Sequence, residues 1–287
     1  MYAVGIDLAW SPRNGTGLAI AEKKRSAWVV REAISDLGTN RKILEVLQKH
    51  VGGRPAIVAI DAPLVVPFEK RGREGDRLIT KLFGPYEAGV YPATRFYLGR
   101  YGGKRIWDLV ADLERTGFRH DCHIVPEKPS RQFFETYPHA ATVALFGLRK
   151  TLKYKTRQGR TYETRWREFR KLESLLRGLA RARPAMVGVS DLLAGDVRTL
   201  RGGRLKAYED RLDAILCAYV AAYYWAWGTR RNAIIGTLEG GYIVTPMTPA
   251  ITKRAPPETR ILTYEGFAPR TSERTKRSLI SDLKNES

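Results

Sequence analysis

The stretch YAVGIDLAW, residues 2–10, holds a single charged residue, Asp7, in an otherwise apolar run. A short apolar run of this kind predicts a β-strand that is buried on both faces. An ionised carboxylate in such a strand costs several kcal/mol unless another group compensates its charge. Asp7 is therefore expected to have companions elsewhere in the chain.

Further carboxylates stand at equivalent places. VAIDAPL puts Asp61 after an apolar strand, and QFFETYP does the same with Glu135. A helix expected from about 205 to 227 adds Asp213 at the rim of its apolar face and Asp210 further toward solvent. If the strands are neighbours, these acids lie close together and repel each other unless cations bridge them. An oxygen-only site suits two Mg²⁺ or Mn²⁺ ions, about 3.5–4 Å apart, that promote displacement at phosphorus.

The rest of the pattern predicts an α/β fold. The Asn14-Gly15 turn predicts a hairpin after the first strand, and a third strand, a helix and the Asp61 strand follow. NAIIGTLEGGYIVTP predicts a second hairpin near the C-terminus. We expect a mixed five-stranded central sheet that is flanked by helices, with this C-terminal hairpin beside it.

Composition and motif order suggest one main domain. We expect it over residues 1–250, with a basic, mostly helical insertion at about 148–203 and a basic polar tail at 251–287. The 287 residues are 43% hydrophobic, which is enough for a sizeable core. No apolar stretch is long enough to span a bilayer, and the N-terminus lacks a signal-peptide pattern. We therefore expect a cytoplasmic protein.

The net charge of +20 makes nucleic acid the leading partner class, ahead of an anionic membrane surface. Residues 148–183 hold thirteen basic residues and three glutamates, and this segment carries half of the net positive charge of the chain. Aromatic side chains interleave with them and could stack on unpaired bases. They are Tyr154, Tyr162, Trp166 and Phe169. The alternative is a solvated helix whose aromatic residues face the core.

The joint set of motifs is more specific than any one of them. GIDLAW, AIDAPL, FFETYPHAA, KYK and DRLDAILCA, followed by LEGGYIVTP, resemble the DUF429 family, which is itself only predicted to be a nuclease. The order of the Asp-bearing strands and the helix resembles the ribonuclease-H-like superfamily. The pair Asp210 and Asp213, followed by alanine, is similar to the last motif of the Holliday-junction resolvases. The resemblance covers about residues 1–250 and implies a ribonuclease-H-like fold.

The resemblance also implies roles for the acidic residues. Asp7 would bridge two metal ions, Mg²⁺ or Mn²⁺, while Asp61 would bind one of them and Asp213 the other. Asp210 would be the auxiliary member of the helical pair. Glu135 would be a fourth ligand or a base that orients water.

Basic residues would hold the nucleic acid. Lys153 and Lys155 of KYK would bind the scissile or a flanking phosphate. Four arginines would bind the same strand of nucleic acid. They are Arg157, Arg160, Arg165 and, from the less matched segment GVYPATR, Arg95. A role in cutting branched junctions would favour a homodimer.

The function predicted on these grounds is a metal-dependent nuclease, with two other readings open. A nucleic-acid-binding protein of the same fold without cleavage is one, and an actin-like sugar or acid kinase is the other, although a kinase would need a second such domain. A lone aspartate at a strand end is more often a cap than a ligand. RHDCH at 119–123 could bind a soft metal but lacks a fourth ligand at a recognisable spacing. His139 could act as a base, although a structural histidine is the commoner case.

Overall fold

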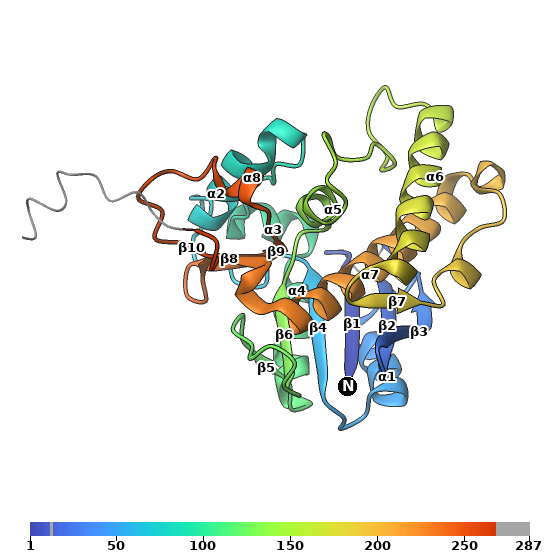
Figure 1. Cartoon of the computed structure of the whole chain (residues 1–287), viewed down its shortest axis with the longest axis horizontal. Helices are drawn as coiled ribbons and strands as arrows, with labels where there is room; N and C mark the ends of the chain where they lie inside the picture. The colour runs from blue at the N-terminus through green and yellow to red at the C-terminus, as the bar shows by residue number, and fades with distance from the viewer. Residues whose placement is uncertain (12–13, 268–287) are drawn as a thin grey trace, which may run out of the picture.

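A computed structural model describes residues 1–11 and 14–267 and is built around a seven-stranded sheet (Figure 1). The strand order is β5-β6-β4-β1-β2-β3-β7. The strands are β1 Tyr2–Asp7, β2 Gly17–Lys24, β3 Ala27–Ile34, β4 Ala56–Asp61, β5 Arg119–His120, β6 Arg131–Glu135 and β7 Ala185–Val187. The predicted count of five is wrong, because β5 and β7 extend the sheet at its edges. Strands of two and three residues are too short to leave a periodic sequence pattern.

The sheet is mixed. The first hairpin is confirmed, since β1 pairs antiparallel with β2, and β2 with β3. On the other side of β1, strands β4, β6 and β5 run parallel to it in turn, and β7 runs parallel to β3. Parallel neighbours need crossover connections, and helix α1, Asn40–His50, provides the one from β3 to β4.

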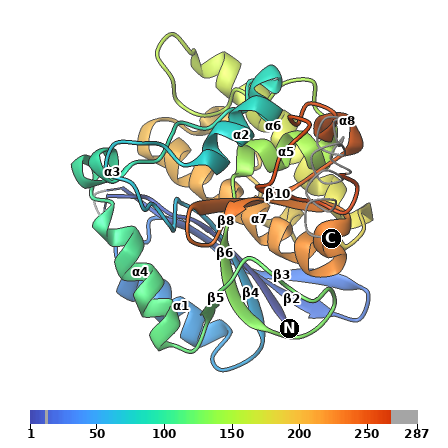
Figure 2. The ribbon, with the colours of Figure 1, turned by 90° about the vertical axis from the view of Figure 1, so that its left-hand side faces the viewer.

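Helices cover both faces of this sheet (Figure 2). One face packs against α1, α3 (Arg95–Tyr101) and α4 (Lys104–Arg115). The opposite face packs against α7 (Gly202–Trp227), with α6 (Tyr162–Gly178) in the same core. The basic segment expected as an insertion therefore supplies α6 and the edge strand β7.

A smaller sheet packs beside the first. The predicted C-terminal hairpin is confirmed as β8 (Asn232–Thr237) and β9 (Gly241–Pro246), and β10 (Leu262–Thr263) joins it at β8. Its core also contains side chains of α2 (Glu74–Phe83), α5 (Pro138–Phe146) and α8 (Pro249–Thr252). Residues 268–287 of the predicted tail lie outside the described residues.

Short 3₁₀ helices complete the described elements. They are η1 Gly84–Tyr86, η2 Leu179–Arg181, η3 Ser190–Leu192, η4 Val197–Thr199 and η5 Gly228–Arg230. Within the described ranges 1–11 and 14–267, no helix combines the length and the apolar character that crossing a membrane requires.

The two faces of β1 carry side chains of different size. Tyr2, Val4 and Ile6 pack toward α1 and α4, whereas Ala3 and Gly5 face α7. Strand β2 repeats the pattern, with large residues toward α1 and small ones toward α7. The alternation lets α7 lie directly on the backbone of both strands.

Two glycines make this close contact possible. A Cβ atom on Gly5 would lie 2.0 Å from the carbonyl oxygen of Ala214, and one on Gly17 would lie 2.0 Å from that of Asp210. Neither oxygen can withdraw, because both belong to the backbone of α7. The contact fixes where this helix presents its side chains at the ends of the strands.

We expect Gly5→Ala to destabilise the protein by about 3 kcal/mol, because α7 has to move away from β1 to admit a methyl group. Thermal and urea unfolding measure the effect. The control is Gly53→Ala, since a Cβ atom there has no neighbour within 4 Å. Equal stability of the Gly5 and Gly53 variants would contradict the close helix contact.

Candidate active site

Asp7 and Asp61 are the last residues of neighbouring parallel strands, in direct register. Their side chains point to the α7 face, because Gly5 and Ala59, two residues earlier in each strand, lie on that face. The prediction that these two carboxylates meet at one end of the sheet is therefore confirmed.

Helix α7 brings two further carboxylates to the same place. Asp210 and Asp213 are one turn apart, and both are buried, with exposed fractions of 2% and 0%. The expectation that Asp210 faces solvent is wrong, because the backbone of α7 at Asp210 lies against Gly17 of β2. Asp210 is paired with Lys206, with 2.6 Å between Nζ and Oδ1.

Two consecutive residues of the KYK motif bind Asp213. The hydroxyl of Tyr154 donates to Oδ1 at 2.7 Å, and the ammonium of Lys155 lies 2.8 Å from Oδ2. Oδ1 is therefore hydrogen-bonded, whereas Oδ2 is ion-paired and has no hydrogen-bond partner among the described residues. The ammonium also faces Asp7 and Asp61, so that a single cation serves three aspartates.

The aspartates divide into two kinds by their pKa. Burial raises the pKa of Asp7 well above its usual value, and the charges of Asp213 and Asp61 add to this rise although Lys155 opposes it. Burial likewise raises the pKa of Asp61 to about 6. For Asp213, burial is outweighed by Lys155 and Tyr154, which hold its pKa below the usual value. Asp213 is thus the compensated anion, whereas Asp7 and Asp61 still lack positive charge.

Glu135 does not join this cluster. It pairs in register with Ile60 rather than with Asp61, so its side chain lies on the opposite face of the sheet. Both of its oxygens accept hydrogen bonds from Arg73, at 2.7 and 2.8 Å, and the backbone N–H of Leu64 donates to one of them at 2.9 Å. The sequence pattern correctly predicts a carboxylate at the end of β6, but it does not determine on which face of the sheet the side chain lies.

Arg73 was missed by the sequence analysis. Its guanidinium is 2% exposed and binds Asp76 at 2.7 Å in addition to Glu135 and the carbonyl oxygen of Val65. Asp76 in turn accepts a hydrogen bond from the backbone N–H of Ala93. The spacing of Arg73 and Asp76 by three residues at a helix start was the available signal.

A cavity of about 260 Å³ opens onto the cluster. Asp7, Asp61 and Lys155 line it, together with Glu135 and Arg73. The lining also includes Tyr137, His139 and two aromatic side chains with exposed surface, Trp10 and Tyr91. The cavity therefore joins the ends of β1 and β4 to the ion pair of Arg73 and Glu135.

The other predicted nucleic-acid contacts are dispersed. Lys153 pairs with Glu87, while Arg160 and Arg165 donate to the carbonyl oxygens of Lys155 and Tyr154. Arg157 is exposed, and Arg95 is exposed with its Nε bound to the carbonyl oxygen of Val66.

Arg165 is buried and so cannot contact a bound strand. Tyr154, Trp166 and Phe169 are buried as well, which leaves Tyr162 as the exposed aromatic residue of the four. The alternative reading of this segment, with aromatics facing the core, therefore holds for three of them.

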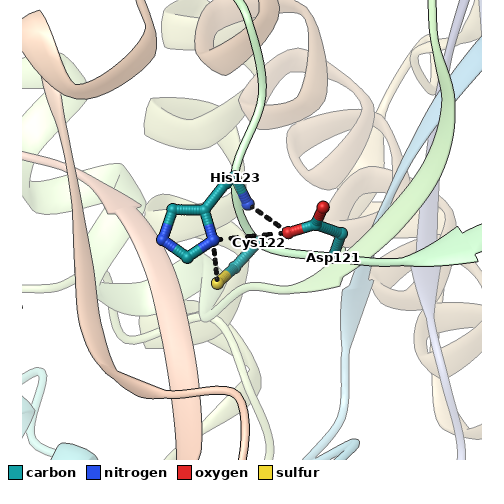
Figure 3. Close-up of side chains that lie close together, drawn as sticks. All are labelled: Asp121, Cys122 and His123. Atoms are coloured by element: carbon teal, nitrogen blue, oxygen red, sulfur yellow. Dashed lines mark hydrogen bonds and ion pairs between the residues drawn. The ribbon is translucent and has the colours of Figure 1, made fainter.

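The RHDCH segment brings three candidate metal ligands together (Figure 3). The ligand atoms of Asp121, Cys122 and His123 lie within 4.8 Å of one another, and in the described residues no other group of three His, Cys or carboxylate ligands is as tight. His120 takes no part, because its Nε2 is 3.0 Å from the hydroxyl of Tyr242. Burial raises the pKa of Cys122 to about 12, so a metal would have to displace a firmly held proton.

Burial, reinforced by the charge of Lys155, lowers the pKa of His139 to about 3. The unfolded chain takes up a proton on this ring below about pH 6.5 while the folded protein does not, so acid favours unfolding. Between about pH 7 and pH 5 we expect this residue to remove about 2 kcal/mol of stability. Urea unfolding at the two pH values measures the effect. The free energy of unfolding of His139→Gln should fall by about 2 kcal/mol less than that of wild type. The free energy of His123→Gln, a substitution at an exposed site, should fall as much as that of wild type. An equal loss in all three proteins would contradict a neutral, buried His139.

Comparison with known proteins gives a family but no activity. No curated protein and no solved structure matches the chain. Residues 5–234 match the family model described as a protein of unknown function (DUF429), and the chain therefore belongs to the DUF429 family.

Proposed function

We propose that the protein is a divalent-metal-dependent nuclease that hydrolyses phosphodiester bonds of DNA or RNA at the Asp7, Asp61 and Asp213 cluster. The observation that carries the proposal is that Asp7 and Asp61, at the ends of two neighbouring strands, line one cavity together with Lys155, whose ammonium is ion-paired with the buried Asp213 of α7. An aspartate that only caps a helix or a turn would not need other carboxylates beside it.

The strand order supports a ribonuclease-H-like arrangement. Strands β3, β2 and β1 form an antiparallel meander, and β4 and β6 continue the sheet in parallel from β1. Helix α7 lies across β1, β2 and β4, as Figure 1 shows, and carries the last acidic pair. These features support the ribonuclease-H-like fold that the family resemblance implies.

The acids suit a hard divalent cation. Every candidate ligand in the cluster is a carboxylate oxygen, which favours Mg²⁺ or Mn²⁺ over softer metals. The buried Oδ2 atoms of Asp210 and Asp213 have no hydrogen-bond partner in the described part of the chain, and carboxylate oxygens of this kind are suited to a cation. A divalent ion bound here would make water more acidic and stabilise negative charge on the leaving oxygen.

The protein side chains would share the remaining work. Asp7 and Asp61 would hold the ion at the strand ends, and Lys155 lines the cavity where a phosphate would enter. Asp213 acts through Lys155, which it orients together with Tyr154. Glu135 serves the site indirectly, because its ion pair with Arg73 builds the cavity wall.

Nucleic acid is the substrate class that fits the surface. The net charge of +20 attracts a polyanion over long range. At the cavity, Tyr91 is 85% exposed and Trp10 is 36% exposed, so each offers a ring face on which an unpaired base can stack. The stacking role that the sequence analysis gave to the basic segment is better filled by these two residues.

Asp7→Asn and Asp61→Asn should each lower metal-dependent cleavage by about 100-fold or more, because an amide cannot supply the charge that holds a divalent ion. Labelled single-stranded, duplex and branched DNA and RNA, incubated with Mg²⁺, Mn²⁺ or EDTA, provide the measurement. Binding of the same substrates should persist in both variants. Asp108→Asn, at an exposed position on α4, is the control. Cleavage that survives both cluster substitutions would refute the site.

Tyr91→Ala should weaken binding of single strands by about tenfold, the loss of one stacked base, and should affect duplexes much less. Tyr91→Phe keeps the ring and should bind as wild type does. Fluorescence anisotropy at several salt concentrations measures both effects, and affinity should fall steeply with salt in all three proteins. Equal affinity of the Ala and Phe variants for single strands would exclude stacking at this position.

A further inference from the structure

The number of cations in the cluster follows from the groups already bound to its acids. Asp213 is fully buried, its Oδ1 accepts a hydrogen bond from Tyr154 at 2.7 Å, and its Oδ2, which has no hydrogen-bond partner among the described residues, forms an ion pair with Lys155 at 2.8 Å. A metal ion at Asp213 would lie beside the Lys155 ammonium, and the two positive charges would repel each other. The site predicted from the resemblance, in which Asp213 binds the second ion, conflicts with this ammonium.

Lys155 is held in place from both ends. Its ammonium is bound to Asp213, and its backbone carbonyl accepts a hydrogen bond from Arg160 at 2.5 Å. The preceding carbonyl, of Tyr154, accepts one from the buried Arg165 at 2.8 Å. With a side chain that is 27% exposed, Lys155 reaches the cavity while it remains anchored.

The acids of α7 differ from those of the strands in their ion pairs. Asp210 shares Lys206 with Glu209, at 2.6 and 2.7 Å, and Asp213 has Lys155. Asp7 and Asp61, side by side on β1 and β4, have no ion pair of their own within 4 Å among the described residues and face Lys155 at longer range. The place left for an additional cation is between these two strand ends.

We propose that Lys155 serves as a built-in second cation, so that the cluster binds one divalent ion, at Asp7 and Asp61, instead of two. Together with Asp210 and Glu209, the three aspartates are opposed by Lys155, Lys206 and Arg165, and one divalent ion balances the two negative charges that remain, whereas two divalent ions would leave an excess of positive charge. In catalysis Lys155 would stabilise the charge that develops on the phosphate, as a second metal ion would. This inference rests on the proposed nuclease function.

Counting bound Mn²⁺ tests the inference without any measurement of activity. The full-length chain is titrated with MnCl₂ alone, and calorimetry and the electron paramagnetic resonance signal of free Mn²⁺ give the stoichiometry. We expect one ion on wild type and two on Lys155→Gln, because removal of the ammonium frees Asp213 for a metal. Lys155→Arg keeps the charge and should bind one ion.

Lys153→Gln is the matched control from the same KYK motif, since Lys153 pairs with Glu87 rather than with the cluster. It should bind one ion. Two ions on wild type, or a single ion on a folded Lys155→Gln protein, would overturn the inference and leave the proposed nuclease standing. If Lys155→Gln fails to fold, the wild-type and Lys155→Arg counts still decide. No bound Mn²⁺ on any of the proteins would overturn the inference and the proposed function together.

Discussion

The close contact of α7 with the backbone of β1 and β2 is the constraint on which the rest of the structure depends. Gly5 and Gly17 have no side chain because the carbonyl oxygens of Ala214 and Asp210 occupy that space. The helix is thereby placed so that its acidic turn meets the ends of the strands. A larger residue at either glycine would separate the parts of the site before it altered any functional group.

The cluster combines carboxylates in different electrostatic states. Asp213 is compensated by Lys155 and Tyr154, whereas Asp7 and Asp61 stay protonated more readily because their burial is not offset. A buried, partly compensated set of acids is costly in an apoprotein and becomes favourable when a cation binds. The arrangement is therefore suited to a ligand of positive charge, in a protein whose surface attracts negative charge.

Sequence reasoning recovered what depends on strand pattern and missed what depends on register. The motifs gave Asp7, Asp61 and the α7 pair, because each follows from an apolar run or a helical period. The prediction that Glu135 lies beside the aspartates did not hold, because a shift of one residue in register moves a side chain to the other face of the sheet. The charge of Arg165 suggested a phosphate contact, yet the residue is buried and anchors the backbone beside Lys155. No local pattern separates a surface arginine from a buried one.

The ion pairs that Arg73 makes with Glu135 and Asp76 differ in kind from the charges on the surface. They are buried and in direct contact, so mobile ions cannot enter between them, whereas exposed charges are screened over about 10 Å at moderate salt. Salt at a concentration that screens the surface charges would leave this wall of the cavity intact. The attraction of the surface for anions and the shape of the cavity can thus be varied independently, the first by ionic strength and the second by substitution.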